Sequence, residues 1–254
     1  MIFEAHRGVA NEYPENTLPA FEAAHKLGYK MIECDTKFTA DDRCIFLHDR
    51  SCYRTARTSD GGRVPDTPAN ELTFDEIRSW DFGLWMGERF RGTLAPTLEE
   101  VLEFVARTEV PLKLDNVFMS FKPEQREIMY RIIERSGTEE YMGFTCKSLD
   151  QVEYHTARFP KCTIHYEYHV DAPFDESVIA RAAELSKDHR FTVFIPMDIK
   201  ATAWFKGPHA TPENCAIAKK YGELGLWILR TEDELRQAKE LGADIVETDG
   251  SLRP

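Results

Sequence analysis

The chain has 254 residues, of which 42% are hydrophobic, enough to build a large core. Its formal net charge of -12 disfavours nonspecific binding to nucleic acid or to an anionic membrane surface, and no stretch is apolar for long enough to span a bilayer. The 6 cysteines include no C-x-x-C spacing, so a zinc or redox motif has no support, although a bridge between Cys44 and Cys52 stays open. We therefore expect a soluble, cytoplasmic protein.

Short apolar runs alternate with helical patterns along most of the chain. We predict strands that start at Ile2, Lys30, Val110, Tyr141, Thr163, Phe191, Leu226 and Asp244. Nearly all of them precede a helical pattern, namely residues 18–27, 97–102 and beyond, 123–135, 148–158, 176–186, 211–222 and 232–241. Eight strands that alternate with helices indicate a single α/β domain over residues 1–254, a (β/α)8 TIM barrel rather than an open doubly wound sheet.

Residues 50–95 interrupt this alternation. Glycine, proline and charged residues cluster there, and the segment is too long for an ordinary loop. Residues 43–47 are a further predicted strand segment, separated from the second strand by a turn at residues 40–42. We expect a small cap-like insertion after the second strand and this segment. Its aromatic residues either form a core of their own or line a substrate entrance: Tyr53, Trp80, Phe82, Trp85 and Phe90.

Polar residues stand where several predicted strands end, and active sites of α/β barrels lie at those ends. The candidates by this rule are His6, Arg7, Glu33, Asp35, His48, Asp115, Glu167 and Asp249. Glu33 and Asp35 are two residues apart in a strand, so their side chains project together. Two carboxylates held so close repel each other unless a cation, a proton or a basic group lies between them.

An ordered set of motifs gives these candidates a more specific meaning. His6-Arg7-Gly8 is followed by Pro14-Glu15-Asn16-Thr17, Glu33-x-Asp35, Thr39-x-Asp41 and His48-Asp49, and later by Pro96-Thr97-Leu98-Glu99-Glu100 and Thr248-Asp249. In this order and spacing the sequence closely resembles the glycerophosphodiester phosphodiesterases. The likeness is strongest over residues 6–49 and weakest over residues 117–225. The family's fold is a TIM barrel with a small insertion after the second strand.

The resemblance implies an acid/base pair of His6 and His48, and imidazole suits that role because its pKa lies near neutrality. It also implies a phosphate-binding Arg7 and a metal on Glu33, Asp35 and the third-strand Asp115. All-oxygen ligation favours magnesium or calcium over zinc.

The neighbours of these residues have less direct roles. For Asp49 and Asn16 we expect hydrogen bonding rather than chemistry. For Glu15 the sequence allows two roles, orienting a histidine or ligating the metal.

The third strand departs from the family pattern Glu-x-Lys. Asp115 stands in place of the glutamate, and Val117 takes the place of the lysine near the phosphate. Lys37 or Lys113 could supply the missing charge. Glu167 and Trp227 are further candidates for substrate binding, and His165, Glu167 and His169 alternate on one strand face, so they either line the pocket or form a buried polar network.

We therefore predict a metal-dependent phosphoric diester hydrolase that converts a small glycerophosphodiester into an alcohol and glycerol phosphate. The alternatives are a phosphodiesterase acting on a lysolipid, similar to sphingomyelinase D or lysophospholipase D, and a binding barrel with impaired catalysis. Neither the head group nor the oligomeric state follows from the sequence.

Overall fold

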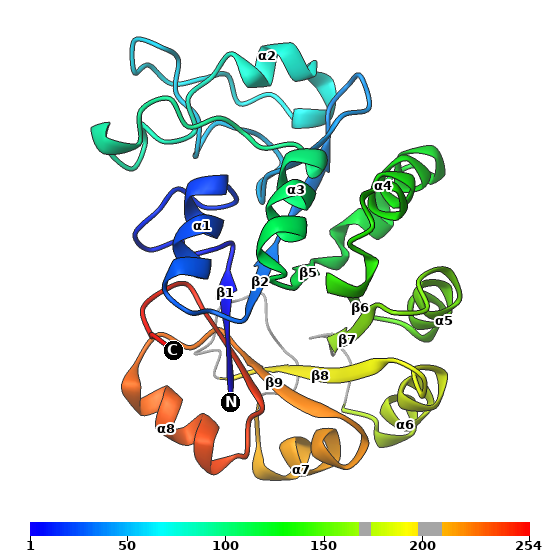
Figure 1. Ribbon diagram of the computed structural model, residues 1–254. Helices are drawn as coiled ribbons and strands as arrows, with labels where there is room; N and C mark the ends of the chain where they lie inside the picture. The colour runs from blue at the N-terminus through cyan, green and yellow to red at the C-terminus, as the bar shows by residue number, and fades with distance from the viewer. Residues whose placement is uncertain (168–173, 198–209) are drawn as a thin grey trace.

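A computed structural model describes residues 1–167, 174–197 and 210–254, without the side chains of residues 116 and 117. Eight parallel strands form a closed barrel (Figure 1). They are β1 (Ile2–His6), β2 (Met31–Cys34), β5 (Leu112–Leu114), β6 (Met142–Cys146), β7 (Thr163–Glu167), β8 (Arg190–Pro196), β9 (Glu223–Trp227) and β10 (Ile245–Thr248). The strand order β1-β10-β9-β8-β7-β6-β5-β2 closes between β1 and β2, which confirms the TIM barrel.

Helices cover the outside of the barrel (Figure 1). The long ones are α1 (Leu18–Lys26), α3 (Leu98–Thr108), α4 (Pro123–Ser136), α5 (Leu149–Arg158), α6 (Glu176–Leu185), α7 (Pro212–Tyr221) and α8 (Glu232–Glu240). Local sequence explains their ends. Thr97 and Glu100 form a capping box at the start of α3, and Gly137 ends α4 in the left-handed conformation.

The start of β9 differs most from its predicted position. β9 begins at Glu223, three residues before the predicted start at Leu226. Glu223 forms an ion pair with Arg190 on the adjacent strand, at 2.7 Å. A charged residue therefore opens the strand, and the apolar pattern begins only after it.

Residues 43–47 form no barrel strand. β4 (Cys44–Phe46) pairs antiparallel with β3 (Thr36–Phe38) in a separate two-stranded hairpin. The hairpin leads from β2 into residues 50–95, which lie together beyond α1 and α3 at the top of Figure 1. This segment holds the short helices η1 (Ala69–Glu71), α2 (Phe74–Arg78) and η2 (Glu88–Phe90).

The insertion has an apolar cluster of its own, separate from the main core. Its buried members are Ile45, Leu47, Cys52, Ala56, Val64, Ala69, Leu72, Ile77, Phe82 and Ala95, with Trp80 packed against them. Of the other predicted aromatics, Tyr53 is exposed and Phe90 packs on Tyr13 with the ring centroids 5.4 Å apart. None of the five lines the cavity at the barrel mouth described below.

Alternate residues of the strands point into the barrel, and many of these are polar. Glu4, Lys113, His165, Thr192 and Glu247 are all buried. The apolar residues of the same strands pack against the helices in the main core. The barrel interior below the site therefore contains several buried polar and charged side chains. It also contains a small apolar cluster of Met31, Phe194 and Ile245.

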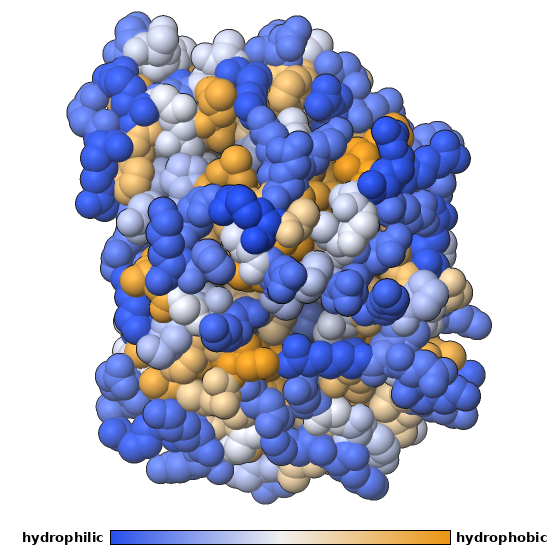
Figure 2. All heavy atoms as spheres, viewed as in Figure 1, coloured by the Kyte–Doolittle hydropathy of each residue, from blue (hydrophilic) through white to orange (hydrophobic). Residues whose placement is uncertain are grey.

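The surface gives little further indication of function. Hydrophilic residues cover most of the face seen in Figure 2, with hydrophobic residues in scattered groups. Among the described residues, no helix is both long and apolar enough to cross a membrane. All 6 cysteines are buried and free, so Cys44 and Cys52 form no bridge.

Candidate active site

The carboxyl ends of the barrel strands surround a cavity of about 340 Å³. Most of the predicted site residues line it: His6, Arg7, Glu33, Asp35, His48, Lys113, Asp115, Glu167 and Trp227. Lys37 and Asp249 are not among the lining residues, and Asp249 forms an ion pair with Arg230 at 3.0 Å. Lys147, Ile228 and Glu247 complete the lining. The strand register explains the convergence, because Glu33 is aligned with His6 on one side and with Lys113 on the other.

Three carboxylates form an oxygen-rich set in this cavity. One oxygen from each of Glu33, Asp35 and Asp115 lies within 4.8 Å of the others. A second set with this spacing joins His6 and Glu247 to the same Glu33. The all-carboxylate set has the donor chemistry of a hard divalent cation, so it fits the metal that the resemblance implies.

The electrostatics of the carboxylates agree with a cation site. Burial raises the pKa of Glu33 well above its usual range, and the charge of Asp35 raises it further. Burial likewise raises the pKa of Asp35, against the opposing charge of Arg7. A cation among these groups would relieve their repulsion and keep them ionised.

The two histidines have different surroundings. His6 Nε2 lies 3.9 Å from a Glu33 oxygen. Burial, together with the charges of Arg7 and Lys113, holds the pKa of His6 well below its usual range, and a neutral ring can accept a proton. His48 Nδ1 lies 2.7 Å from a carboxylate oxygen of Asp49. This contact engages Nδ1 and leaves Nε2 as the nitrogen that can transfer a proton.

A chain of ion pairs connects His48 to the carboxylate set. Arg54, from the insertion, donates to Asp49 at 2.6 Å and to Glu15 at 2.7 Å. Glu15 accepts from Arg7 Nη1 at 3.1 Å, and Arg7 Nε lies 3.3 Å from Asp35. Hydrogen bonds from His48 and Arg54 lower the pKa of Asp49, so it stays ionised. Glu15 therefore acts here as a link between two arginines.

The loop after β1 is held in an unusual backbone conformation. Arg7 and Asn16 both have φ of 55°, the left-handed region that non-glycine residues seldom adopt. Asn16 Nδ2 donates to Asp35 at 2.8 Å, and the Asp35 backbone N–H donates back to Asn16 Oδ1 at 3.1 Å. This two-way bonding is the hydrogen-bonding role predicted for Asn16, and it fixes the position of a proposed metal ligand.

The lysines are arranged differently from what the sequence suggested. Lys113 is 2% exposed, and its Nζ lies 2.6 Å from Glu247 and 3.3 Å from Glu4. Lys37 does not line the cavity; its Nζ donates to the Thr36 carbonyl at 3.4 Å. The side chain of Val117 lies outside the described side chains. Lys147 does line the cavity, with Glu167 as an ion-pair partner at 3.2 Å.

Sequence reasoning missed Lys147, although a usable signal was present. Lys147 follows β6 directly, so it stands at a strand end, the position from which the other candidates were chosen. Burial opposes its charge, yet the Glu167 carboxylate raises the pKa of Lys147, so the ammonium persists.

His165 does not line the cavity. It is buried below the barrel mouth, and its Nδ1 lies 2.6 Å from Thr192 Oγ1. This contact is that of a buried polar network, one of the two roles predicted for it. His169 lies outside the described residues.

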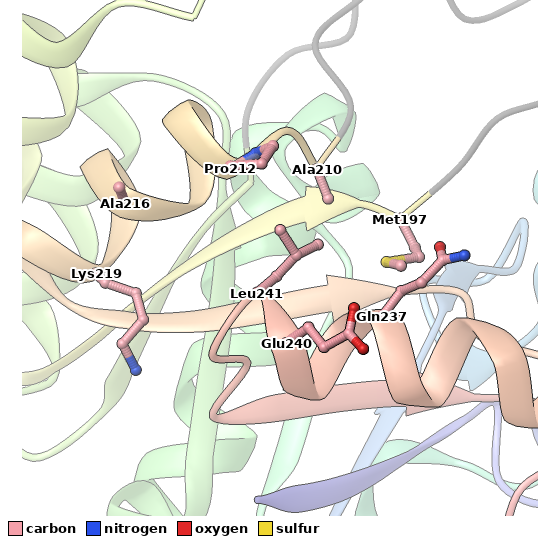
Figure 3. A pocket seen from close by; sticks show the side chains of 8 residues that line it. All are labelled: Met197, Ala210, Pro212, Ala216, Lys219, Gln237, Glu240 and Leu241. Carbon is pink, nitrogen blue, oxygen red and sulfur yellow. The ribbon is translucent and has the colours of Figure 1, made fainter.

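A larger cavity, of about 620 Å³, lies between α7 and α8 (Figure 3). Its lining is mainly aliphatic, with Met197 and Leu241, and its lysine, Lys219, forms an ion pair with Asp244 at 2.8 Å. It contains none of the predicted site residues. The chemistry is therefore concentrated in the smaller cavity at the barrel mouth.

The fold and this cavity define a TIM-barrel protein with two histidines and an acidic ligand set at the carboxyl ends of its strands. Residues 6–165 match the family model described as the glycerophosphoryl diester phosphodiesterase family. The chain belongs to this family.

This chain aligns with its curated relatives over only part of their length. A glycerophosphodiester phosphodiesterase of Caldanaerobacter subterraneus is 41% identical over 101 residues, which are 40% of this chain and 39% of that protein. Glycerophosphodiester phosphodiesterase 1 of Mus musculus is 33% identical over 44% of this chain and 32% of its own. The matched region thus covers well under half of these relatives.

Solved structures support the fold over nearly the whole chain. An Oleispira antarctica phosphodiesterase, in complex with the product sn-glycerol-3-phosphate, has a TM-score of 0.75 at 18% identity and covers 99% of this chain and 94% of that one. A glycerophosphodiester phosphodiesterase from Agrobacterium tumefaciens has a TM-score of 0.70 at 20% identity, with 98% and 96% covered.

Proposed function

We propose that the protein hydrolyses glycerophosphodiesters to an alcohol and glycerol phosphate. The observation that carries this proposal is the convergence of His6, His48, Arg7 and the carboxylate set in one cavity of about 340 Å³. The names of the relatives agree with it, and the Oleispira antarctica phosphodiesterase holds the product that we expect here. We further propose a cytoplasmic location, where free cysteines stay reduced.

The two histidines carry the proton transfers. His6, kept neutral by its surroundings, takes the proton of the nucleophile, which is either water or the neighbouring hydroxyl of the substrate. As the nucleophile's oxygen bonds to phosphorus, the bond from phosphorus to the leaving alcohol breaks. His48, held by Asp49, gives its proton to that alcohol oxygen. With water as the nucleophile, the diester and one water become one alcohol and one phosphomonoester. With the neighbouring hydroxyl, the first products are the alcohol and a cyclic phosphodiester, and one water then opens the cyclic diester to the same phosphomonoester.

Glu33, Asp35 and Asp115 would hold a divalent cation, magnesium or calcium. When bound, the cation neutralises negative charge on the phosphodiester and orients it for attack. Arg7 and Asn16 position Asp35 for this purpose through the contacts given above.

We infer that Lys147 provides the positive charge that the third strand lacks. Its side chain lines the reaction cavity, is 28% exposed and forms an ion pair with Glu167. Lys113 is less suited to this role because its charge faces two buried carboxylates. Lys37 is less suited because it lies outside the cavity lining.

The test is hydrolysis of glycerophosphocholine and of lysophosphatidylcholine, each with magnesium, calcium or a chelator. We expect glycerol phosphate from the first substrate, dependence on a divalent cation, and loss of turnover in His6→Ala and in His48→Ala. Preference for the lysolipid would favour the sphingomyelinase-D-like alternative. No turnover by the wild-type protein on either substrate would favour the impaired binding barrel.

A further inference from the structure

A groove beside the reaction cavity is lined by positive charge, although the chain as a whole is acidic. It has a volume of about 450 Å³ and lies between the hairpin strand β3, the insertion helix η1 and the segment that leads into α4. Three cationic side chains line it, Lys37, Arg50 and Lys122. We call it the basic groove. Within the described part of the chain, no aspartate or glutamate is among its lining residues.

The cations of the basic groove are available to a ligand. No salt bridge is found for any of the three among the residues that the structure describes. The carboxylates of the turn between β3 and β4 are engaged elsewhere: Asp41 accepts hydrogen bonds from Thr39 and from the Phe74 backbone, and Asp42 accepts one from Gln125. The charges of Asp35, Asp115 and Asp49 also act on Lys37, but none of them forms a salt bridge with it in the described part of the chain. An anion in the groove would therefore meet positive charge without displacing an ion pair.

The groove is continuous with the reaction cavity through one residue. His48 lines both spaces. In the reaction proposed above, His48 protonates the leaving alcohol, so that alcohol lies at the mouth of the groove. Whatever the alcohol carries beyond its ester oxygen then extends along Phe38 and Phe121, whose ring centroids are 5.2 Å apart, toward the three cations.

We propose that the basic groove binds an anionic group on the leaving alcohol, so that the preferred substrates are glycerophosphodiesters whose alcohol carries a second negative charge, such as a phosphate. This inference rests on the proposed function. The groove's volume suits a group the size of a phosphorylated polyol. Lysine and arginine are the side chains that bind phosphate, and a partly enclosed site screens them less than bulk water does.

The test compares two diesters that differ only in this charge: glycerophosphoglycerol, and the same diester with a phosphate on the leaving glycerol. We expect kcat/KM of the wild-type protein to be roughly tenfold higher for the phosphorylated diester. A tenfold ratio corresponds to about 1.4 kcal/mol of additional binding free energy, which the attraction between the phosphate and the groove's cations would supply. In the double variant Arg50→Gln/Lys122→Gln that ratio should fall to about threefold or less, because the cations that favour the phosphate are gone. Turnover of glycerophosphoglycerol should be unchanged.

A matched control removes the same charge elsewhere. Lys26 and Lys30 are exposed and lie at the opposite end of the barrel, where β2 begins. The variant Lys26→Gln/Lys30→Gln should keep the wild-type ratio. A wild-type ratio near one, or an equal fall in both double variants, would overturn the proposal.

A binding measurement separates this inference from the proposed reaction. Calorimetric titration of both diesters into the His6→Ala protein, with and without Arg50→Gln/Lys122→Gln, needs no turnover. Tighter binding of the phosphorylated diester that depends on Arg50 and Lys122 would support the groove even if hydrolysis failed. Equal affinity for the two diesters would overturn it even if hydrolysis succeeded.

Discussion

Replacing Lys113 by methionine tests whether this lysine supports the barrel or serves the substrate. Its ammonium is the cationic partner of Glu4 and Glu247, whose side chains are 0% and 4% exposed. It also lies 3.6 Å from the ring centroid of Phe194. Removing one partner from a buried pair leaves an uncompensated charge, which costs about 3–5 kcal/mol. We expect Lys113→Met to lower the free energy of unfolding by about 4 kcal/mol at pH 8.

The assay is urea denaturation with a chelator present, and the matched control is Lys147→Met. Lys147 is also paired with a glutamate but is 28% exposed, so its loss should cost no more than about 1 kcal/mol. The deficit of Lys113→Met should also narrow as the pH falls, because carboxyls left without their cation take up protons. A deficit equal to that of the control, or one that is independent of pH, would refute the structural role.

Three further predictions follow from the site and the core. His48→Ala should lose roughly a thousandfold on glycerophosphocholine but less than about tenfold on glycerophospho-p-nitrophenol, whose alcohol leaves without protonation; equal losses would contradict the assignment of His48 as the acid. Asp115→Asn should raise the metal concentration for half-maximal activity by roughly tenfold or more, and an unchanged titration would remove Asp115 from the ligand set. Burial lowers the pKa of His155 to about 4, so the stability that depends on its neutral ring is complete above pH 6.5 and is lost as the pH falls toward 4. The deficit of His155→Gln in urea denaturation should therefore be smaller at pH 5.5 than at pH 8 by about 1.4 kcal/mol, and the same deficit at both pH values would contradict this.

The fold was predictable because its signals are local and repeated. Each strand is a short apolar run, and the helices carry capping and glycine signals such as Thr97 and Gly137. The start of β9 was missed because Glu223 opens the strand with a charge. The strand segment at residues 43–47 is confirmed by β4. Its antiparallel pairing with β3 was not predicted, because the apolar pattern does not specify the partner of a strand.

Most residues that line the candidate site were predictable from the sequence, but Lys147 was missed, and the contacts among the residues were not predictable. His6, Glu33 and Asp35 stand at strand ends, so the barrel rule brings them to one mouth. The role of Lys113 was not predictable, because its partners Glu4 and Glu247 are 109 and 134 residues away in sequence. Arg54 joins the site for a similar reason, since only the folded insertion brings it to Glu15.

The central claim is that this cavity cleaves a glycerophosphodiester by hydrolysis. The most direct measurement is ³¹P nuclear magnetic resonance of glycerophosphocholine incubated with the wild-type protein and a divalent cation. The account predicts that the diester signal is replaced by that of glycerol phosphate, and that the His6→Ala protein leaves it unchanged. A diester signal that persists with the wild-type protein, or a final product in which the phosphate stays on choline, would contradict the account.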